Sequence, residues 1–353
     1  MVRETCAILG AGAMGTALAT PLVHNGQEVR LWGTELDTAL LQELRMGRPH
    51  PRLDVAVSER VALYDPPDLA AALAGADIVV LAITSEGVVS ILRRAIPYLQ
   101  PGQPLLMVTK GLGYDALGRV SLLPPLLAAE LPSSLRESCP IVAAGGPCKA
   151  NEVAAGWPTA TVYGSADRQA LLRCLDCFQT AVYRVLPTDD ITGLEVAAAL
   201  KNSYAIALGI CDGLEEVSAH PWHNLKAALF AQAQAEMIQL ACMLGGRDET
   251  VTGLAGCGDL EVTALSGRNR LFGMCLGRGE AVAEALEAMR RREQTVEGVA
   301  ATRFAVELVR QLAGEGRTTL EAFPLLSAIH ALLEGATNPL ALLSRAALFQ
   351  ALT

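Results

Sequence analysis

One lysine stands alone in a long apolar stretch of the sequence. Lys201 is the only charged residue between Glu195 and Asp212, and its neighbours are mostly Ala and other small or apolar residues. These small residues allow close packing all round a helix, so we expect Lys201 to be buried. A buried ammonium needs a carboxylate or a polar substrate as its partner. Such a lysine suits acid catalysis, and a purely internal ion pair is the alternative.

A glycine-rich segment further along the chain offers a carboxylate and two donor side chains. Asp259 and Thr263 lie in the run 253–263, and Arg268 and Asn269 follow a further glycine. A guanidinium and an amide are donors that suit phosphate oxygens. The segment therefore predicts an acid for the buried lysine and a site for an anion. A glycine-rich loop with a helix-capping aspartate is the alternative.

A second lysine ends an apolar run. Lys110 closes the run 104–110 and is the only cation between Arg94 and Arg119. Ligands bind beyond the carboxyl ends of the strands in a parallel sheet, so its amine would point into that crevice. Gly146 follows a later apolar run and predicts another close approach of the backbone to a ligand. A solvated lysine at a strand end is the alternative for Lys110.

The start of the chain has the order strand, tight turn and helix. Apolar residues 5–9 precede the sequence GAGAMG, and an alanine-rich helix follows it. The first glycine permits the turn, the second lets the backbone approach a pyrophosphate, and the third lets helix and strand pack closely. Free N–H groups at the helix start face an anion. A plain glycine turn is the alternative to a cofactor site. The predicted cofactor contacts in this turn are Gly10, Ala11, Gly12, Ala13, Met14 and Gly15.

The second predicted strand, 28–32, ends at Trp32, where a cofactor's adenosine ribose would be recognised. Glu35 lies twenty residues after Gly15, near the expected acidic position, and Thr34 precedes it. An acid favours NAD, whereas a hydroxyl with a neighbouring arginine can hold the 2′-phosphate of NADP. Both cofactors stay open at this point.

Two kinds of structure must position these residues. Continuous apolar runs at 77–84 and 104–110 are typical of parallel strands that are covered on both faces. Further strands are expected at 140–144, 159–163 and 182–186, and from Asp190 onward the periodicity is that of helices. We predict an α/β fold, in which residues 1–188 form a Rossmann-type dinucleotide-binding domain with a doubly wound parallel sheet. Residues 189–353 would form an all-α substrate and catalytic domain.

Length and composition agree with two domains and limit the partners. The chain has 353 residues, a net charge of −9 and no block of Lys or Arg, which argues against nucleic acid and an anionic membrane surface. We read no membrane segment and no signal peptide, so we expect a cytoplasmic protein. Its nine cysteines should then be free thiols. Cys174 and Cys177 form a CxxC on a predicted helix face, where burial is expected over redox or metal use. No metal site is predicted.

Together these pieces resemble the NAD(P)-dependent sn-glycerol-3-phosphate dehydrogenase family over nearly the whole chain. Each match is short, but their order and spacing are specific. The matching sequences are GAGAMGTA near the start, TKG at Lys110, GPxxAxE from Gly146 to Glu152, KNSYAIALGICDGL from Lys201, NLKAAL from Asn224, GLAGCGDLEVT with GRNRLFG from Gly253 to Gly273, and VEG from Val296.

The resemblance implies a role for individual residues. Lys201 would protonate or polarise the carbonyl oxygen of dihydroxyacetone phosphate, assisted by Asp259 and Lys110. The implied substrate contacts are Lys110, Gly146, Asn202, Thr263, Arg268 and Asn269, the last two holding the phosphate. The cofactor contacts expected beyond the glycine turn are Trp32, Thr34, Glu35, Lys110, Ala150, Arg268 and Glu297.

Three positions depart from the family pattern. Thr84 stands where the family often has proline, Lys149 occupies a usually apolar position, and Thr34 replaces the arginine that is common after the second strand. These departures leave the choice between NAD and NADP open, and they do not change the expected reaction.

The expected function is reversible hydride transfer between NAD(P)H and dihydroxyacetone phosphate, which yields sn-glycerol 3-phosphate for the backbone of phospholipids. The cofactor would supply the hydride chemistry, and the protein would supply position and charge. A two-domain dehydrogenase for another 2-hydroxy or 2-oxo acid and an NAD(P)-binding regulator without turnover are the alternatives. The expected partner is a small phosphorylated substrate, and a homodimer is an open possibility that the sequence does not decide.

Overall fold

The computed structural model describes residues 3–292 and 294–347, which fall into two compact units. The first unit contains the chain up to Lys110 together with Leu123–Leu194. The second contains Gly111–Leu122 and the residues from Glu195 onward. We predicted a single boundary between residues 188 and 189, whereas the second unit of the structure begins at Glu195 and also takes in the segment Gly111–Leu122.

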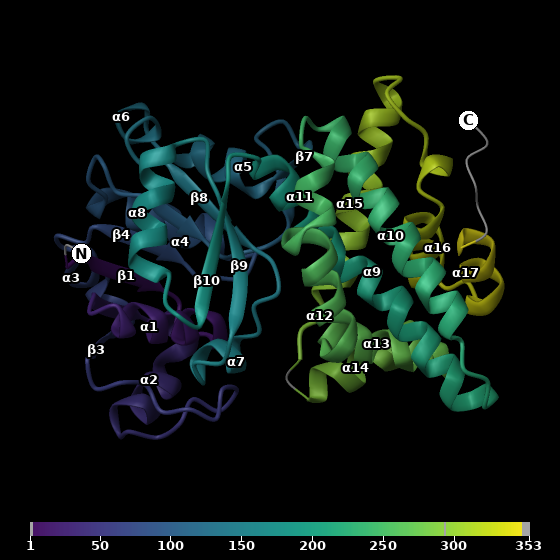
Figure 1. Cartoon of the computed structure of the whole chain (residues 1–353), viewed down its shortest axis with the longest axis horizontal. Helices are drawn as coiled ribbons and strands as arrows, with labels where there is room; N and C mark the ends of the chain where they lie inside the picture. The colour runs from purple at the N-terminus through teal and green to yellow at the C-terminus, as the bar shows by residue number, and fades with distance from the viewer. Residues whose placement is uncertain (1–2, 293, 348–353) are drawn as a thin grey trace. The chain divides into compact units, whose positions relative to one another are not determined.

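In the described residues, the first unit holds one eight-stranded sheet in the order β10-β9-β8-β5-β4-β1-β2-β3 (Figure 1). Its strands are β1 (Thr5–Leu9), β2 (Glu28–Trp32), β3 (Val61–Tyr64), β4 (Ile78–Leu81), β5 (Leu105–Met107), β8 (Ile141–Gly145), β9 (Thr159–Gly164) and β10 (Tyr183–Thr188). Neighbouring strands from β3 to β8 pair in parallel, which confirms the doubly wound α/β class. The pair β9 and β10 runs antiparallel to the rest. Apolar patterning does not reveal this reversal, because it reports burial and not direction.

Helices cover both faces of this sheet. Helix α1 packs with α7 and α8 on one face, and α4 packs with α3 and α5 on the other. Because both faces are covered, every side chain of β4 and β5 is buried, as their apolar sequences predicted. The helices are α1 (Ala13–His24), α2 (Thr38–Arg45), α3 (Leu69–Leu73), α4 (Val88–Ala95), α5 (Leu123–Glu130), α6 (Ser133–Arg136), α7 (Ala150–Ala154) and α8 (Arg168–Phe178).

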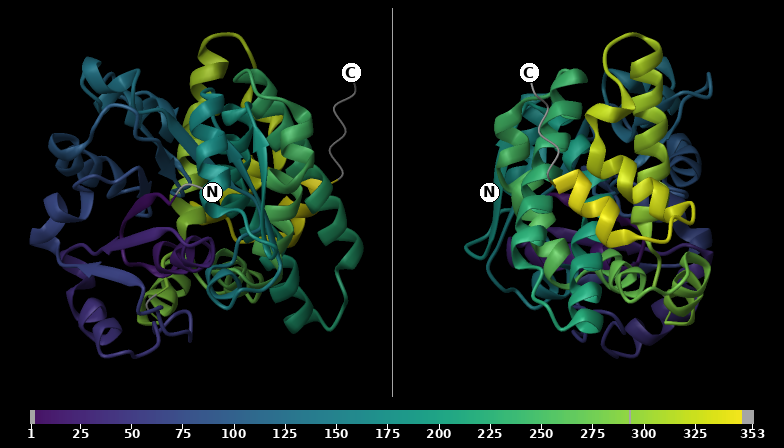
Figure 2. Two further views of the ribbon diagram at one scale, coloured as in Figure 1. Left: turned by 60° about the vertical axis from the view of Figure 1, so that its left-hand side comes forward. Right: turned by 90° about the vertical axis from the view of Figure 1, so that its right-hand side faces the viewer.

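The second unit is built from helices around α9, with a short antiparallel hairpin of β6 and β7; Figure 2 shows these helices, green to yellow, from two further sides. Of the helices described, α9 is the one long and apolar enough to cross a membrane, and 94% of its 18-residue apolar part is buried inside the protein, as in a core helix. The elements are β6 (Leu112–Tyr114), β7 (Val120–Leu122), α9 (Ile191–Ser218), α10 (His223–Met243), α11 (Asp248–Thr252), α12 (Asp259–Ser266), α13 (Arg268–Gly277), α14 (Val282–Arg291), α15 (Glu297–Gly314), α16 (Pro324–Leu333) and α17 (Pro339–Ala347).

Glycines on α9 and α13 bring the backbones of these two helices into contact. A Cβ on Gly209 or Gly213 would lie 2.2 or 2.1 Å from carbonyl oxygens of α13, and one on Gly273 would lie 2.1 Å from a carbonyl oxygen of α9. No side chain fits at such a distance, so both helices need glycine along their shared face. This close packing places Asn269, near the start of α13, against Asn202 on α9.

Candidate active site

The buried lysine of α9 meets an aspartate at the start of α12. The Nζ of Lys201 donates to Oδ1 of Asp259, and both side chains are buried. This confirms that the isolated lysine is buried and faces this carboxylate. A buried ion pair of this kind can hold an ammonium in a fixed direction and deliver a proton from it, so the geometry fits the acid role expected of Lys201.

A π-helical turn, Leu254–Gly258, positions Asp259. A Cβ on Gly256 would lie 2.1 Å from the carbonyl oxygen of Val251, so this turn folds back on α11 only with glycine there. Thr263, one turn further along α12, donates its hydroxyl to the carbonyl oxygen of Asp259 at 2.6 Å. Turns of this type are frequent at functional sites. The glycines of the run 253–263 therefore shape the backbone that carries the acid.

The side chain of Asn269 joins three segments of the second unit. Its Nδ2 donates to Oδ1 of Asn202 at 3.0 Å, and its Oδ1 accepts from the backbone N–H of Gly298 at 2.8 Å. A Cβ on Gly298 would lie 2.5 Å from the carbonyl oxygen of Asn202, so glycine is needed where α15 begins. Asn202 and Asn269, expected as separate substrate contacts, are thus fixed against each other by a hydrogen bond.

Arg268 lies at the edge of the same cluster and makes two side-chain contacts. Its Nη2 donates to Oε1 of Glu297 at 2.5 Å, and its Nη1 donates to the hydroxyl of Thr295 at 2.9 Å. The sequence singled out Arg268 and Glu297 separately and did not predict that they pair. A guanidinium that is half exposed can exchange a carboxylate for another anion at little cost, which suits a phosphate-binding group.

In the first unit, the glycine turn has the shape that a dinucleotide requires. Gly10 has a φ of +114°, and a Cβ on Gly15 would lie 2.0 Å from the carbonyl oxygen of Gly10. At Gly12, by contrast, a Cβ would meet no heavy atom within 4 Å. In the part of the chain that the structure describes, no side chain caps the helix at Gly12, so the first N–H groups of α1 are left without a side-chain partner. The residues present therefore fit the pyrophosphate of a dinucleotide. When the dinucleotide is bound, its nicotinamide supplies the hydride chemistry.

The end of β2 carries the residues expected at the adenosine ribose. Trp32 is buried, and the hydroxyl of Thr34 donates to the carboxylate of Asp37 at 2.8 Å while it accepts from the backbone N–H of Leu36 at 3.3 Å. Glu35 forms an ion pair with Arg94 on α4. Hydrogen bonds from Arg94 are the main reason why the pKa of Glu35 is lowered, so this carboxylate is ionised at neutral pH.

The other predicted residues of the first unit lie beyond the carboxyl ends of its strands. Lys110 follows β5, and Gly146, with a φ of +97°, follows β8. The two strands are parallel neighbours, so both residues belong to the same edge of the sheet. Ala150 begins α7 after the same turn, and Lys149 forms an ion pair with Glu152 at 3.7 Å.

Sequence reasoning missed His50. Its side chain is buried, its Nδ1 accepts from the backbone N–H of Arg52 at 3.1 Å, and within the described residues its Nε2 makes no hydrogen bond of full geometry, although it lies near the backbone of Ala11. Burial lowers the pKa of His50, and the backbone of Ala11 in the glycine turn partly opposes this effect. The ring is therefore neutral at pH 7 and lies at the turn. The spacing of His50 from the turn follows no motif, so only the fold could reveal this contact.

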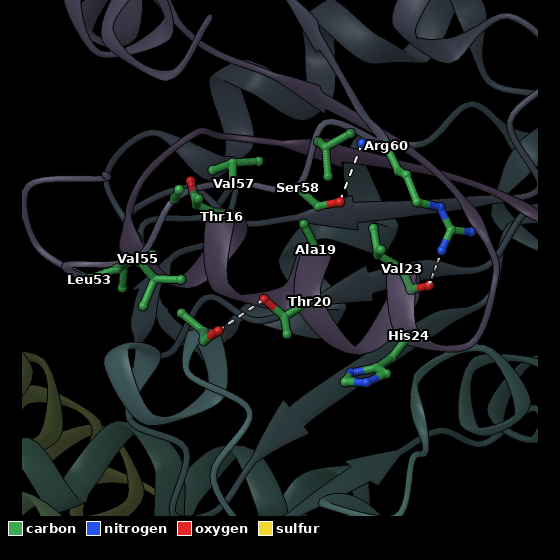
Figure 3. Close-up of a pocket in the computed structure, with 13 residues that line it drawn as sticks. Thr16, Ala19, Thr20, Val23, His24, Leu53, Val55, Val57, Ser58 and Arg60 are labelled. Carbon is green, nitrogen blue, oxygen red and sulfur yellow. Dashed lines mark hydrogen bonds between the residues drawn. The ribbon is translucent and has the colours of Figure 1, made fainter. Parts of the chain in front are cut away.

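The cysteine pair and a hollow of the first unit lie apart from the predicted residues. Cys174 and Cys177 are buried, free thiols of α8, and burial raises the pKa of Cys174, which makes it unreactive. A hollow of about 350 Å³ lies along α1, between residues such as Thr20 and the segment that carries Val57 (Figure 3). None of the predicted site residues lines it. Among residues 3–292 and 294–347, no three His, Cys, Asp or Glu side chains gather as metal ligands.

Comparison with known proteins covers both units. A family model described as the N-terminus of NAD-dependent glycerol-3-phosphate dehydrogenase matches residues 5–171, and the model for the C-terminus of the same enzyme matches residues 190–344. The NADP(+)-dependent glycerol-3-phosphate dehydrogenase of Archaeoglobus fulgidus is 40% identical over 285 residues, which cover 81% of this chain and 83% of that protein. The glycerol-3-phosphate dehydrogenase [NAD(P)+] of Moorella thermoacetica is 38% identical over 317 residues, 88% of each chain.

A solved structure agrees with these matches. The crystal structure of glycerol-3-phosphate dehydrogenase from Coxiella burnetii is 32% identical to this chain, with a TM-score of 0.81, and the alignment covers 97% of this chain and 98% of that one. Both units, the glycine turn and the lysine of α9 thus occur within the matched regions. The chain belongs to the NAD(P)-dependent glycerol-3-phosphate dehydrogenase family.

Proposed function

We propose that the protein transfers a hydride reversibly between NAD(P)H and C2 of dihydroxyacetone phosphate, giving sn-glycerol 3-phosphate. The observation that carries the proposal is the buried pair of Lys201 and Asp259 in the same unit as the half-exposed Arg268. The family to which the chain belongs supports the choice of substrate, and the names of its relatives support NAD or NADP as the cofactor.

The side chains divide the work as follows. The ammonium of Lys201 gives a proton to the carbonyl oxygen of the ketone as negative charge develops there, and the carboxylate of Asp259 fixes the direction of that ammonium. Arg268 exchanges Glu297 for the phosphate of the substrate. Asn202, which Asn269 holds in place, presents its remaining hydrogen-bonding capacity to the substrate. Lys110, at the edge of the sheet, stays a predicted second cation.

The decisive experiment is the oxidation of NADH and of NADPH by the purified chain with dihydroxyacetone phosphate. Rapid oxidation with this ketone supports the proposal. Turnover only with 2-oxo acids would instead favour a related dehydrogenase, and binding of the nucleotide without any turnover would favour a regulator. Product chirality, measured with a stereospecific coupling enzyme, should be that of sn-glycerol 3-phosphate.

We further infer a cytoplasmic location and a role in supplying glycerol phosphate for phospholipids. The nine cysteines are free thiols in the structure, which is usual in a reducing compartment. Depletion of the protein in its host should lower the pool of sn-glycerol 3-phosphate, and added glycerol should restore it where a glycerol kinase is present. A homodimer stays a prediction that light scattering on the full chain would test.

A further inference from the structure

The side chains of Trp32, Arg94 and Glu35 contact one another in sequence beside the turn that follows β2. The guanidinium carbon of Arg94 lies 5.2 Å from the ring centroid of Trp32, close enough for a cation–π contact. Nη1 and Nη2 of Arg94 donate to the two carboxylate oxygens of Glu35, each at 3.0 Å. The indole itself is buried, and its Nε1 donates to the carbonyl oxygen of Pro66 at 3.3 Å. Arg94 therefore orients the Glu35 carboxylate through a bidentate contact, while the Glu35 side chain stays 63% exposed and accessible to a ligand.

The same turn contains a second carboxylate and a hydroxyl that points inward. Asp37 accepts from both the backbone N–H and the hydroxyl of Thr34, each at 2.8 Å, which closes the turn as a capping box. The hydroxyl proton of Thr34 is thus directed at Asp37. The turn carries the charges of Glu35 and Asp37, and among the ion pairs of the described residues Arg94 is the cation that contacts it, through Glu35.

This arrangement bears directly on which ribose the turn can accept. A carboxylate has about four lone-pair sites, so Glu35 keeps acceptor capacity for a hydroxyl while Arg94 occupies two of them. In folds of this type, an acid after the second strand accepts a hydrogen bond from the 2′-hydroxyl of the adenosine ribose. A 2′-phosphate at the same place would instead meet the charges of Glu35 and Asp37.

We propose that Glu35 is the residue that selects an unphosphorylated ribose, that Arg94 is a positioning residue which acts through Glu35, and that the protein therefore prefers NAD(H) to NADP(H). The proposal deepens the proposed function, since it presupposes a nicotinamide dinucleotide as the cofactor. It also gives a physical reason for the departure at Thr34, because the threonine that stands in place of the family arginine binds Asp37 and leaves the turn acidic.

The test is direct binding of NADH and NADPH to the full chain, measured by calorimetry without substrate. We expect the unchanged protein to bind NADH at least about tenfold more tightly than NADPH, as the loss of one charge-assisted hydrogen bond and the added repulsion imply. Glu35→Gln should bring the two dissociation constants within about threefold of each other. Arg94→Gln should weaken the binding of NADH by about threefold to tenfold without strengthening the binding of NADPH to the same extent.

Two further variants separate positioning from a general effect on α4. Arg93, the neighbour of Arg94, makes a similar two-pronged contact with Glu130, so Arg93→Gln should leave both affinities unchanged. In the Glu35→Gln background, Arg94→Gln should have little further effect, because the residue through which it acts is already altered. Equal losses in Arg93→Gln and Arg94→Gln would overturn the positioning role.

Other outcomes also contradict the proposal. Two results would mean that Arg94 holds a 2′-phosphate. One is tighter binding of NADPH than of NADH by the unchanged protein, and the other is a selective loss of NADPH affinity in Arg94→Gln. Failure to bind either nucleotide would overturn this proposal and the proposed function together. The expected ratio of affinities without any turnover of dihydroxyacetone phosphate would uphold the proposal and refute the proposed substrate.

Discussion

The second unit contains two ion pairs of similar chemistry in very different surroundings. The side chains of Lys201 and Asp259 are 9% and 1% exposed, whereas those of Arg268 and Glu297 are 40% and 39% exposed. Charges that are buried together are expensive to separate, because whichever remains has lost its compensation. A half-exposed pair contributes at most about 1 kcal/mol, since water and salt compensate each charge. The first pair must therefore stay together, and the second can open.

This difference matches two tasks that a ketone phosphate would impose. Delivery of a proton to a developing alkoxide needs an ammonium whose direction does not change, which burial beside Asp259 provides. Capture of a phosphate needs a cation that can leave its resting partner when a better anion arrives, and Arg268 has that freedom. The comparison teaches that exposure, more than the type of charge, decides which pair is fixed and which is exchangeable.

The largest effect should come from removing the charge of the buried carboxylate. Asp259→Asn keeps the size of the side chain but leaves the Lys201 ammonium without that charge, so we expect the free energy of unfolding to fall by about 3 kcal/mol. Denaturant titration followed by circular dichroism measures this change, with unaltered m-values as a check on two-state behaviour. A loss of stability below about 1 kcal/mol would mean that the buried pair contributes no more than a surface pair, and the comparison between the two pairs would fail.

The next largest effect concerns the lysine itself. Lys201→Met fills a similar volume, so the fold should persist, while turnover should fall by about a hundredfold or more because general acid catalysis is lost. A matched control is Lys226→Met, which removes a lysine that pairs with Asp212 at 2.6 Å. That variant should keep turnover within about threefold, since an ordinary ion pair acts on stability and not on the reacting atoms. A nearly normal kcat in Lys201→Met would exclude Lys201 from the mechanism.

The two pairs also show what could be predicted from the sequence. A single charge in an apolar helix has few possible partners. Its position in the sequence therefore predicted that Lys201 is buried and needs an acidic partner. Arg268 and Glu297 are 29 residues apart and lie on two different helices, and no sequence pattern identifies such partners. The pair of Arg94 and Glu35, 59 residues apart, escaped prediction for the same reason.

The fold divides in a similar way. Strands with continuous apolar sequence, such as β1 and β4, were predicted because burial on both faces selects for them. The short strand β3 and the reversed direction of β9 were not predicted, because local composition reveals neither a four-residue strand nor the direction of a strand. The glycines of α9 and α13 are visible in the sequence, but their purpose appears only when the facing backbone is known.

A third prediction tests whether the exposed pair really binds phosphate. Arg268→Ala should lower kcat/KM for dihydroxyacetone phosphate by about thirtyfold, which corresponds to the 2 kcal/mol at the lower end of the range for truncating a charged contact. Activity on unphosphorylated dihydroxyacetone, already poor, should hardly change. Competition by inorganic phosphate should weaken in the variant by a similar factor. Equal losses on both ketones would mean that Arg268 supports the start of α13 and does not contact the phosphate.

The smallest effect should come from the change that mirrors Asp259→Asn in the exposed pair. Glu297→Gln removes the same charge from a carboxylate, yet the guanidinium it leaves behind is half in water, so the free energy of unfolding should change by less than about 0.5 kcal/mol. Because Arg268 then has no carboxylate to leave, KM for dihydroxyacetone phosphate should fall by about twofold at low salt, and high salt should remove the gain. The measurement pairs denaturant titration with kinetics at two ionic strengths. A loss of stability near that of Asp259→Asn would show that the exposed pair is as firmly held as the buried one, and the distinction between a fixed and an exchangeable pair would fail.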